Sequence, residues 1–584
     1  IGQKWRKPVS TVQDRDLAED FSPNEMQVSA MVAGPGPVLV LAGPGTGKTQ
    51  TLMGRIRRLE ERGADFGRML VVTFTRKAAR ELKERLEKTC RKPLPRTDTL
   101  HALALEYWTE VLGDSPTLLS EESSRKLFAA ANPGLQGKTL KTAWNELSLA
   151  RESGRRIPNE YARRYLDRKT RFHLVDYTDL LEFWMEKVKS GSYGQRFNHV
   201  LVDEVQDLSL LQLNLVMGLA GEGGTGFFAI GDPNQSIYGF RGAVRGLEER
   251  IRQSWPDLKR IRLSRNYRSA QDILDLSSAL LPERQTLVAS KNLTASISLF
   301  EAKSAEQEAD WIAARIRDLL GGTGHWQADR NAQETIGPGD IAVLVRLKAL
   351  TAPIARKLHA AGIPVSVPED EPFFADSRVA LLLSMAGRML GLPDAASDAP
   401  ECPEEIIKKG PLALAAHLSE TPPFDGLFWK NSAFLGLVKA FQTYGGWQGV
   451  MNMTQLETEL CAIRARAQKV QIMTLHGSKG LEFDTVFLPC LEEGIVPFAG
   501  MDMLLGKPAS EILPDMDEER RLFYVGLTRA KTGIFMSYCS SRKFYGKIRT
   551  SFLSSFVRGL PQDMIRKSAL KRHVRRDERQ LSLF

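Results

Sequence analysis

The stretch AGPGTGKT, Ala42–Thr49, lies between an apolar segment, Val38–Leu41, and a helix-forming segment that begins at Thr49. Such a turn binds phosphate, because its backbone N–H groups and the helix N-terminus point at the anion. Lys48 is expected to neutralise the β- and γ-phosphates of a nucleotide, and the Thr49 hydroxyl to hold Mg²⁺. An incidental glycine-rich turn is the alternative, since the strict pattern has glycine in place of Ala42. The predicted nucleotide contacts in the turn are Ala42, Gly43, Gly45, Thr46 and Gly47.

A second apolar segment ends in two acidic residues. VLVDEVQD places Asp203 and Glu204 at the carboxyl end of the expected strand Val200–Asp203, the edge at which ligands bind in parallel sheets. Asp203 is suited to a Mg²⁺-bound water, and Glu204 to accepting a proton from an attacking water. An isolated Asp–Glu pair is commonly a solvated turn, but beside the Lys48 turn it favours nucleotide hydrolysis.

The rest of the chain alternates short apolar strands with amphipathic helices, which predicts an α/β fold with parallel sheets. Two α/β domains are expected, each interrupted by a mostly helical insert. The further expected strands are Met69–Phe74, Phe227–Ile230, Ile261–Leu263, Ile297–Phe300, Ile341–Val345, Val470–Leu475, Thr485–Leu488 and Ile534–Tyr538.

Composition narrows the class of protein further. The 584 residues are 42% hydrophobic and 26% charged, which excludes a mostly disordered or collagen-like chain. A net charge of +10 suits nucleic acid without being specific for it. No apolar stretch is long enough for a membrane helix, the start IGQKWRKP has no signal core, and the missing initiator Met leaves an N-terminal domain open. Five scattered cysteines without a CxxC pair fit a reducing cytoplasm rather than a zinc, iron–sulfur or disulfide framework.

A series of motifs from Asn24 to about Lys531 resembles, in order and wording, the superfamily 1 DNA helicases of the UvrD/Rep/PcrA type. These motifs are PNEMQ (Pro23–Gln27), TFTRKAA (Thr73–Ala79), DTLHALA (Asp98–Ala104), VDYTDLL (Val175–Leu181), GDPNQSIYGFRGA (Gly231–Ala243), NYRS (Asn266–Ser269), TLHGSKGLEF (Thr474–Phe483) and EERRLFYVGLTRAK (Glu518–Lys531). The resemblance implies two RecA-like P-loop domains, ATP and Mg²⁺ as cofactors and DNA as partner. The expected divisions are 1–97 and 196–266 (first domain), 98–195 (its insert), 267–372 and 468–556 (second domain), 373–467 (a short second insert) and 557–584 (a basic flexible tail).

The resemblance also assigns nucleotide contacts. It implies that Gln27 recognises the adenine edge, Tyr267 stacks on adenine and Glu482 lies near the ribose. Gln50 stands where some relatives carry an arginine near the nucleotide. The implied catalytic set is Lys48, Glu204, Gln235 as γ-phosphate sensor, and the two arginines Arg268 and Arg529. Because the arginines and the Lys48–Glu204 pair lie in different domains, hydrolysis is expected to need the two domains closed on ATP.

DNA contacts are implied by the same motifs. Aromatic rings stack on bases of any sequence, as a translocating protein requires. For Phe74, Tyr238 and Phe240 plain core packing is the alternative, and Phe240 stands where close relatives often have Trp. The implied DNA-contacting residues are Thr73, Phe74, His101, Tyr238, Phe240, Arg241 and His476.

The last five residues, QLSLF (Gln580–Phe584), resemble the peptide with which bacterial proteins bind the replication sliding clamp. Such peptides place apolar side chains in a groove and become ordered on binding. Docking on the protein's own surface is the alternative. The expected clamp contacts are Gln580, Leu581, Leu583 and Phe584.

The sequence thus predicts an ATP-dependent DNA helicase that moves 3′→5′ on single-stranded DNA in repair, recombination or replication, in the cytoplasm at the bacterial nucleoid. Direction is carried by the resemblance alone. Three alternatives stay open: a single-strand translocase that strips proteins but unwinds weakly, the motor subunit of a recombination helicase–nuclease complex, and an ATP-binding scaffold that recruits the clamp or repair proteins.

Overall fold

A computed structural model describes most of the chain. The described residues are 22–91, 93–113, 116–155, 159–194, 196–283, 286–321, 336–367, 373–391, 401–419, 421–454, 468–500, 504, 515–544 and 547–568. Within these ranges, no helix combines the length and the apolar character needed to cross a membrane. The expected clamp residues Gln580–Phe584 lie outside the described residues.

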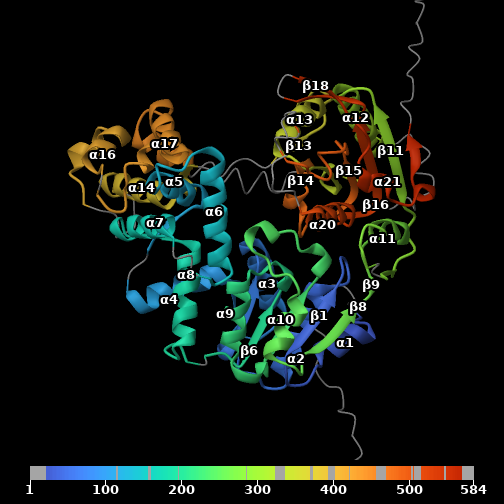
Figure 1. Ribbon diagram of the computed structural model, residues 1–584, viewed down its shortest axis with the longest axis horizontal. Coiled ribbons are helices and arrows are strands. Elements are labelled where there is room, and N and C mark those ends of the chain that lie inside the picture. Colours follow the sequence, from blue (N-terminus) through green and yellow to red (C-terminus); the bar gives the residue numbers. More distant parts are fainter. Residues whose placement is uncertain are drawn as a thin grey trace, which may run out of the picture.

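Two parallel sheets organise the molecule, which confirms the expected α/β fold class (Figure 1). The first sheet has six strands in the order β3–β2–β6–β7–β1–β8. Its strands are β1 (Val38–Ala42), β2 (Met69–Thr73), β3 (Arg96–Thr99), β6 (His199–Val202), β7 (Phe227–Gly231) and β8 (Lys259–Leu263). Helices on it include α1 (Glu25–Met31), α2 (Lys48–Glu61), α3 (Arg76–Thr89), α9 (Leu210–Ala220) and α10 (Leu247–Ser254). We call this sheet with its helices the first lobe.

The side chains of each central strand point alternately to the two faces of this sheet, and a hydrophobic core lies on each face. Val38 and Val40 of β1 pack with Leu52 and Ile56 of α2. Leu39, between them, packs on the opposite face with helices such as α9. Side chains point alternately to the two faces of a strand, so a strand covered on both sides must be apolar throughout. The strands that carry the phosphate turn and the Asp–Glu pair are of this kind, and they hold both at the carboxyl edge of the sheet.

The second lobe has a sheet of seven parallel strands in the order β13–β14–β12–β15–β16–β11–β19. They are β11 (Ser296–Ala302), β12 (Ile341–Val345), β13 (Val365–Ser366), β14 (Val470–Thr474), β15 (Phe483–Leu488), β16 (Ala530–Cys539) and β19 (Arg566–Ser568). Helices of this lobe are α11 (Gln271–Ser278), α12 (Ala305–Gly321), α13 (Thr351–Ala360), α20 (Met516–Leu527) and α21 (Ser555–Arg558). Short strands β9 (Arg265–Asn266) and β10 (Val288–Ala289) lie where the chain enters the lobe, and the hairpin β17 (Ser541–Phe544)–β18 (Lys547–Thr550) follows β16.

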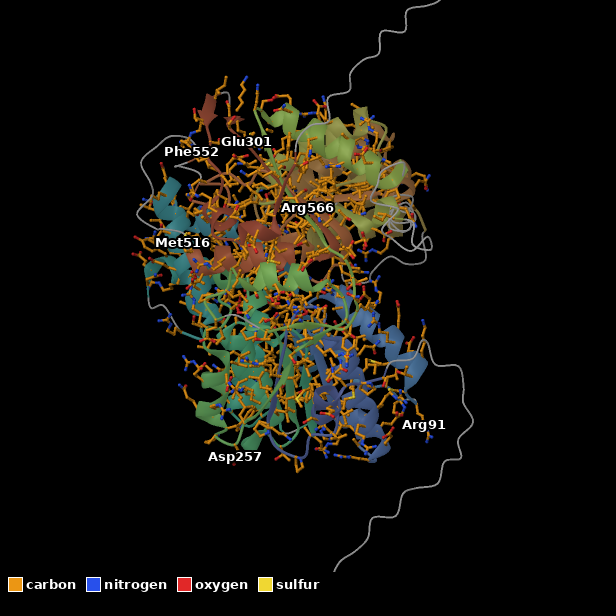
Figure 2. All side chains as sticks on the ribbon, turned by 90° about the vertical axis from the view of Figure 1, so that its right-hand side faces the viewer. Arg91, Asp257, Glu301, Met516, Phe552 and Arg566 are labelled. Atoms are coloured by element: carbon orange, nitrogen blue, oxygen red, sulfur yellow. The ribbon has the colours of Figure 1, made fainter. Side chains whose placement is uncertain are left out.

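Strand β19 lies inside the range 557–584, which the sequence analysis assigns to a basic tail. Ser298 of β11 pairs with Arg566, and Phe300 pairs with Ser568. A polar three-residue segment has no strand pattern of its own, so its pairing depends on the free edge of β11. In Figure 2, which turns the molecule by a quarter, Arg566, Glu301 and Phe552 mark the upper lobe, and Arg91 and Asp257 the lower one.

The two helical inserts pack against each other, away from the second sheet (Figure 1). The Ser377 hydroxyl donates to the Leu118 carbonyl at 2.7 Å, and Arg378 Nη2 donates to Ser123 Oγ at 3.0 Å. The first insert comprises α4 (Leu100–Leu112), β4 (Thr117–Leu119), α5 (Glu121–Ala131), α6 (Gly137–Glu152), α7 (Glu160–Arg171), β5 (Leu174–Asp176) and α8 (Tyr177–Lys189). The second includes α14 (Ser377–Met389), α15 (Glu404–Lys408), α16 (Pro411–His417) and α17 (Ser432–Thr443).

Candidate functional site

The phosphate turn joins β1 to α2, and two of its glycines are required by its shape. Gly45 and Gly47 have φ angles of 66° and 81°, a region that side chains disfavour. A Cβ at Gly45 would lie 2.6 Å from Asn266 Nδ2, and one at Gly47 would lie 2.7 Å from Gln27 Nε2. Thr46 Oγ1 donates to the Gly43 carbonyl at 2.8 Å, which closes the turn. Helix α2 begins at Lys48, so the turn and the helix N-terminus have the geometry of a phosphate cradle.

The segment entering the second lobe contacts this turn through Asn266, which sequence reasoning did not single out. Asn266 Nδ2 donates to the Pro44 carbonyl at 2.6 Å, and the Tyr267 amide donates to the Gly45 carbonyl at 2.8 Å. The side-chain oxygen Oδ1 of Asn266 accepts from the Arg268 amide at 2.8 Å. Asn266 therefore ties the position of Arg268 to the phosphate turn. In the sequence, the position of Asn266 directly before Tyr267 in the NYRS motif could have indicated that it belongs to the site.

The predicted adenine contacts lie beside the turn. Gln27 is fully buried, and its Nε2 donates to the Thr46 carbonyl at 3.0 Å. Its Oε1 accepts from the Asn24 amide at 2.9 Å, and Asn24 Nδ2 donates to the Tyr267 hydroxyl at 2.9 Å. Gln27 and Tyr267 are thus brought together through Asn24. Gln50 is exposed and lines a separate groove between α1 and α2.

The two acidic residues stand at the end of β6 in different electrostatic states. Burial, then the charge of Glu204, raises the pKa of Asp203 to about 7. Desolvation acts to raise the pKa of Glu204 as well, but the cations Lys48 and Lys479 outweigh it, so the pKa is lowered. Gln206 Nε2 donates to Glu204 Oε2 at 2.6 Å and fixes that carboxylate. Glu204 is therefore ionised at neutral pH, as a proton acceptor must be.

Gln235 and Arg529 meet across the two lobes. Arg529 Nη2 donates to Gln235 Oε1 at 2.9 Å, and Gln235 Nε2 donates to Asp232 Oδ2 at 2.8 Å. Arg529 is 2% exposed, and its other donors reach the carbonyls of Val525 and Leu481 at 2.9 and 3.0 Å. Burial, then the charge of Arg268, lowers the pKa of Arg529 to about 9. The guanidinium thus remains charged at neutral pH and is held rigidly at the lobe interface.

Arg268 and Glu482 lie on the same side of the site. Arg268 Nε donates to Glu482 Oε2 at 2.7 Å, and Lys531 Nζ lies 3.1 Å from Glu482 Oε1. Desolvation opposes ionisation of Glu482, but these two cations lower its pKa. The structure therefore places Lys48, Glu204, Gln235, Arg268 and Arg529 around one interface, with Thr49 in the first turn of α2 and Asp203 beside Glu204.

A line of aromatic rings leads away from this interface. Phe74, directly after β2, stacks on Tyr238 with ring centroids 5.1 Å apart. Tyr238 lies 6.1 Å from Phe240, and Phe240 packs edge-on against His476 at 5.9 Å. Phe240 is 58% exposed, which contradicts plain core packing for that ring. Thr73 is buried, with its hydroxyl donating to the Thr75 carbonyl at 3.2 Å.

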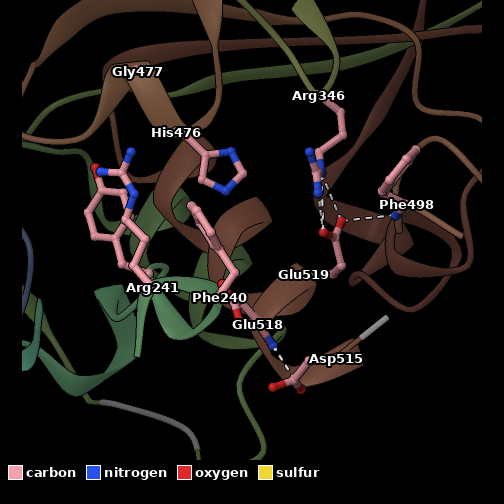
Figure 3. Close-up of a pocket in the computed structure, with 10 residues that line it drawn as sticks. Phe240, Arg241, Arg346, His476, Gly477, Phe498, Asp515, Glu518 and Glu519 are labelled. Carbon is pink, nitrogen blue, oxygen red and sulfur yellow. Dashed lines mark hydrogen bonds and ion pairs between the residues drawn. The ribbon is translucent and has the colours of Figure 1, made fainter. Parts of the chain in front are cut away.

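The rings of Tyr238, Phe240 and His476 line a pocket of about 610 Å³ at the lobe interface (Figure 3). Arg241 places its guanidinium 5.7 Å from the Tyr238 ring and 5.6 Å from the Phe240 ring. Across the pocket, Arg346 lies 4.9 Å from the Phe498 ring and pairs with Glu519, two contacts that the motifs did not reveal. The flat rings of the pocket suit nucleobases, and its lining combines the guanidinium groups of Arg241 and Arg346 with the carboxylates of Asp515, Glu518 and Glu519.

Two histidines of the predicted DNA surface are neutral at physiological pH. Desolvation, then the charges of Arg346 and Arg241, lowers the pKa of His476 to about 4. Desolvation, then Arg76, lowers the pKa of His101 to about 4, and His101 packs edge-on against Tyr177 at 5.4 Å. These rings offer stacking faces and hydrogen bonds rather than positive charge.

A phosphate turn on one parallel sheet, faced by arginines from a second parallel sheet, defines a P-loop NTPase of two lobes. Residues 26–241 match the family model of an AAA domain, and residues 261–390 with 444–541 match that of a UvrD-like helicase C-terminal domain. Among curated proteins, ATP-dependent DNA helicase PcrA of Leuconostoc citreum is 25% identical, over 93% of this chain and 85% of that protein. DNA helicase II of Haemophilus influenzae is 28% identical, over 95% of this chain and 89% of that protein. UvrD2 of Mycobacterium tuberculosis is 28% identical, over 92% of this chain and 81% of that protein.

Over most of its length the chain is therefore similar to the UvrD-like DNA helicases.

Proposed function

We propose that this protein is an ATP-dependent DNA helicase that moves 3′→5′ along single-stranded DNA. The observation that carries the proposal is the contact between Arg529 Nη2 and Gln235 Oε1 across the two lobes, 2.9 Å apart, beside a row of aromatic rings of which Phe240 is exposed. A nucleotide bound at such an interface has one side in each lobe. Its hydrolysis therefore changes how the lobes are held together, next to the pocket proposed for DNA.

Hydrolysis is assigned to residues of both lobes. Lys48 neutralises the β- and γ-phosphates, and Glu204 accepts the proton of the attacking water. Arg268 and Arg529 neutralise the charge that builds on the γ-phosphate in the transition state, where such arginines contribute about 10³–10⁵ in rate. Gln235, held by Asp232 and Arg529, is oriented toward the same group as its sensor.

Thr49 and Asp203 are the residues that would hold Mg²⁺. Mg²⁺ prefers hydroxyl and carboxylate oxygens beside phosphates. Asp203 is buried at the end of β6 beside Glu204, and these two effects raise its pKa to about 7 although Lys48 acts to lower it, so a cation bound there would favour the ionised carboxylate. When bound there, Mg²⁺ neutralises phosphate charge.

DNA binding is assigned to the pocket and its approach. Stacking of a base on an aromatic ring contributes about 1–3 kcal/mol and tolerates any sequence. The Phe74–Tyr238–Phe240–His476 row offers successive rings at 5.1, 6.1 and 5.9 Å, and Arg241 adds a cation to two of them. This arrangement supports sequence-independent movement along one strand.

A weakly unwinding translocase is the second candidate. The second insert is short, and its described part packs on the first insert through Ser377 and Arg378. Fewer residues are then available to grip a duplex ahead of the motor. This candidate shares the ATPase and the movement but not efficient strand separation.

The test is ATP-driven strand separation on duplexes with either a 3′ or a 5′ single-stranded tail. We expect unwinding of the 3′-tailed substrate only, and none with Lys48→Ala. Unwinding of the 5′-tailed substrate contradicts the direction. DNA-stimulated ATPase without unwinding supports the translocase, and the absence of DNA-stimulated ATPase contradicts both.

Two further assignments concern the C-terminal residues and the cellular location. We propose that Gln580, Leu581, Leu583 and Phe584 bind the sliding clamp, on the sequence match alone. We also propose a cytoplasmic location at the nucleoid, which the free state of the described cysteines Cys90, Cys402, Cys490 and Cys539 supports.

A further inference from the structure

One lysine of the second lobe reaches into the first lobe and contacts both halves of the site. Lys479 follows the turn His476–Ser478. Its Nζ lies 2.6 Å from Asp207 Oδ1 and donates to the Gln235 carbonyl at 2.6 Å. The Lys479 side chain is 9% exposed and that of Asp207 is 0% exposed. The contact therefore joins the lobes in a largely buried place.

The partners of Lys479 belong to the segments that carry the hydrolysis residues. Asp207 ends the turn Val205–Asp207, which follows Glu204, and the Asp207 amide donates to the Glu204 carbonyl at 3.0 Å. Gln206, in the same turn, binds the Glu204 carboxylate at 2.6 Å and accepts from the Asp232 amide at 2.9 Å. Holding Asp207 and the Gln235 carbonyl therefore fixes both the proposed base and the proposed γ-phosphate sensor.

The same ammonium lies beside the proposed DNA surface. Lys479 Nζ is 5.2 Å from the centroid of the Tyr238 ring, within the range of a cation–π contact. Tyr238 follows Gln235 by three residues and stacks on Phe74. A base that contacts the Tyr238 ring thus acts next to the charge that holds Asp207 and Gln235.

We propose that Lys479 is a positioning residue that transmits DNA contact at Tyr238 to the hydrolysis site, through Asp207 and the Gln235 carbonyl. The inference rests on the proposed function and adds to it a route by which DNA stimulates hydrolysis. The charge also faces Glu204, so its displacement changes the field at the proposed base as well as the backbone beside it.

The test replaces the charged pair by a neutral pair of similar volume, Lys479→Met with Asp207→Asn. A lone Lys479→Met variant would leave a buried carboxylate unpaired and endanger folding, whereas replacing both partners of a buried pair is close to neutral for stability. The matched control is Lys357→Met with Asp310→Asn, which removes a surface pair of 2.8 Å in the same lobe.

ATP turnover is measured with and without saturating single-stranded oligothymidylate, together with the thermal midpoint of unfolding. We expect the ratio of stimulated to basal kcat to fall by about tenfold or more in the Lys479 pair variant, the size of a lost charge-assisted hydrogen bond. The thermal midpoint stays near that of the wild type, and the control variant keeps the ratio. A Lys479 pair variant with the wild-type ratio overturns the inference.

Tyr238→Leu provides the second measurement. If the signal runs from Tyr238 through Lys479, this substitution lowers the ratio in the wild-type background and adds no loss to the Lys479 pair variant. Losses that add in full overturn the route. A wild-type protein without DNA stimulation overturns the proposed function together with this inference, whereas normal stimulation with an unaffected pair variant overturns the inference alone.

Discussion

Replacing Arg268 by alanine separates its proposed catalytic role from its structural one. Among the described residues, Arg268 makes one side-chain ion pair, to Glu482, with Nε 2.7 Å from Oε2. The two side chains are 18% and 46% exposed. A pair this close to water contributes about 1 kcal/mol or less to stability, so we expect Arg268→Ala to fold normally.

The expected catalytic loss is far larger. An arginine on the γ-phosphate contributes about 10³–10⁵ in kcat, which is roughly 4–7 kcal/mol of transition-state stabilisation. Because Arg529 remains in place, we expect the lower end, a fall in kcat of about 10³. The residual rate should still depend on Lys48.

The assay is steady-state ATP hydrolysis with saturating single-stranded DNA, giving kcat and KM separately, beside a thermal melt of each protein. Arg260→Ala is the control, because Arg260 forms a comparable surface pair with Glu248 at 3.3 Å. We expect the control to keep the wild-type kcat. A folded Arg268→Ala protein whose kcat stays within about tenfold of the wild type refutes the assignment of Arg268 to the γ-phosphate.

Three further predictions concern other parts of the chain. Phe240→Ala removes an exposed ring and should weaken single-stranded DNA binding by roughly 5- to 150-fold, measured by fluorescence anisotropy, since stacking contributes about 1–3 kcal/mol; unchanged affinity would place DNA elsewhere. Burial lowers the pKa of His101 from 6.5 to about 4 in the folded protein. Between these two pH values the unfolded state therefore binds more protons than the folded state, so the contribution of neutral His101 to stability is complete above pH 6.5 and is lost as the pH falls toward 4. Urea unfolding at pH 7 and pH 4.5 should therefore show a smaller loss of unfolding free energy for His101→Gln than for the wild type, and equal losses would contradict the lowered pKa. Deleting Gln580–Phe584 should abolish binding to the sliding clamp while ATPase activity persists; a clamp affinity equal to that of the full chain would exclude the tail as the anchor.

The sequence predicted the central strands of both sheets closely, because their pattern is local. The strand expected at Val38–Leu41 is observed as Val38–Ala42, and that expected at Ile341–Val345 has the same bounds. Strands β3 and β19 were missed because RTDT and RKS are polar. Such segments become edge strands because a neighbouring strand offers unpaired backbone N–H and C=O groups. The residues of the segment itself do not indicate that neighbour. The domain divisions drawn from the sequence stay a prediction.

The site was predicted residue by residue, but its connections were not. Gln27 and Tyr267 are linked through Asn24, and Gln235 contacts Arg529. The roles of these residues with nucleotide and DNA stay predictions. Gln50 lines a groove between α1 and α2. Arg346 and Phe498 line the pocket proposed for DNA, although neither belongs to a motif that was recognised.

The sequence by itself determined the chemistry of the first lobe: a strand, a glycine turn and Lys48 follow one another directly, so local rules suffice to predict a phosphate cradle. Only the tertiary structure decided which side chains join the two lobes. Asn266 reaches Pro44 across 222 residues of sequence, and Lys479 reaches Asp207 across 272. The physical reason is that such contacts arise from the packing of two separate cores, and the local sequence around one partner does not indicate which residue the other partner is.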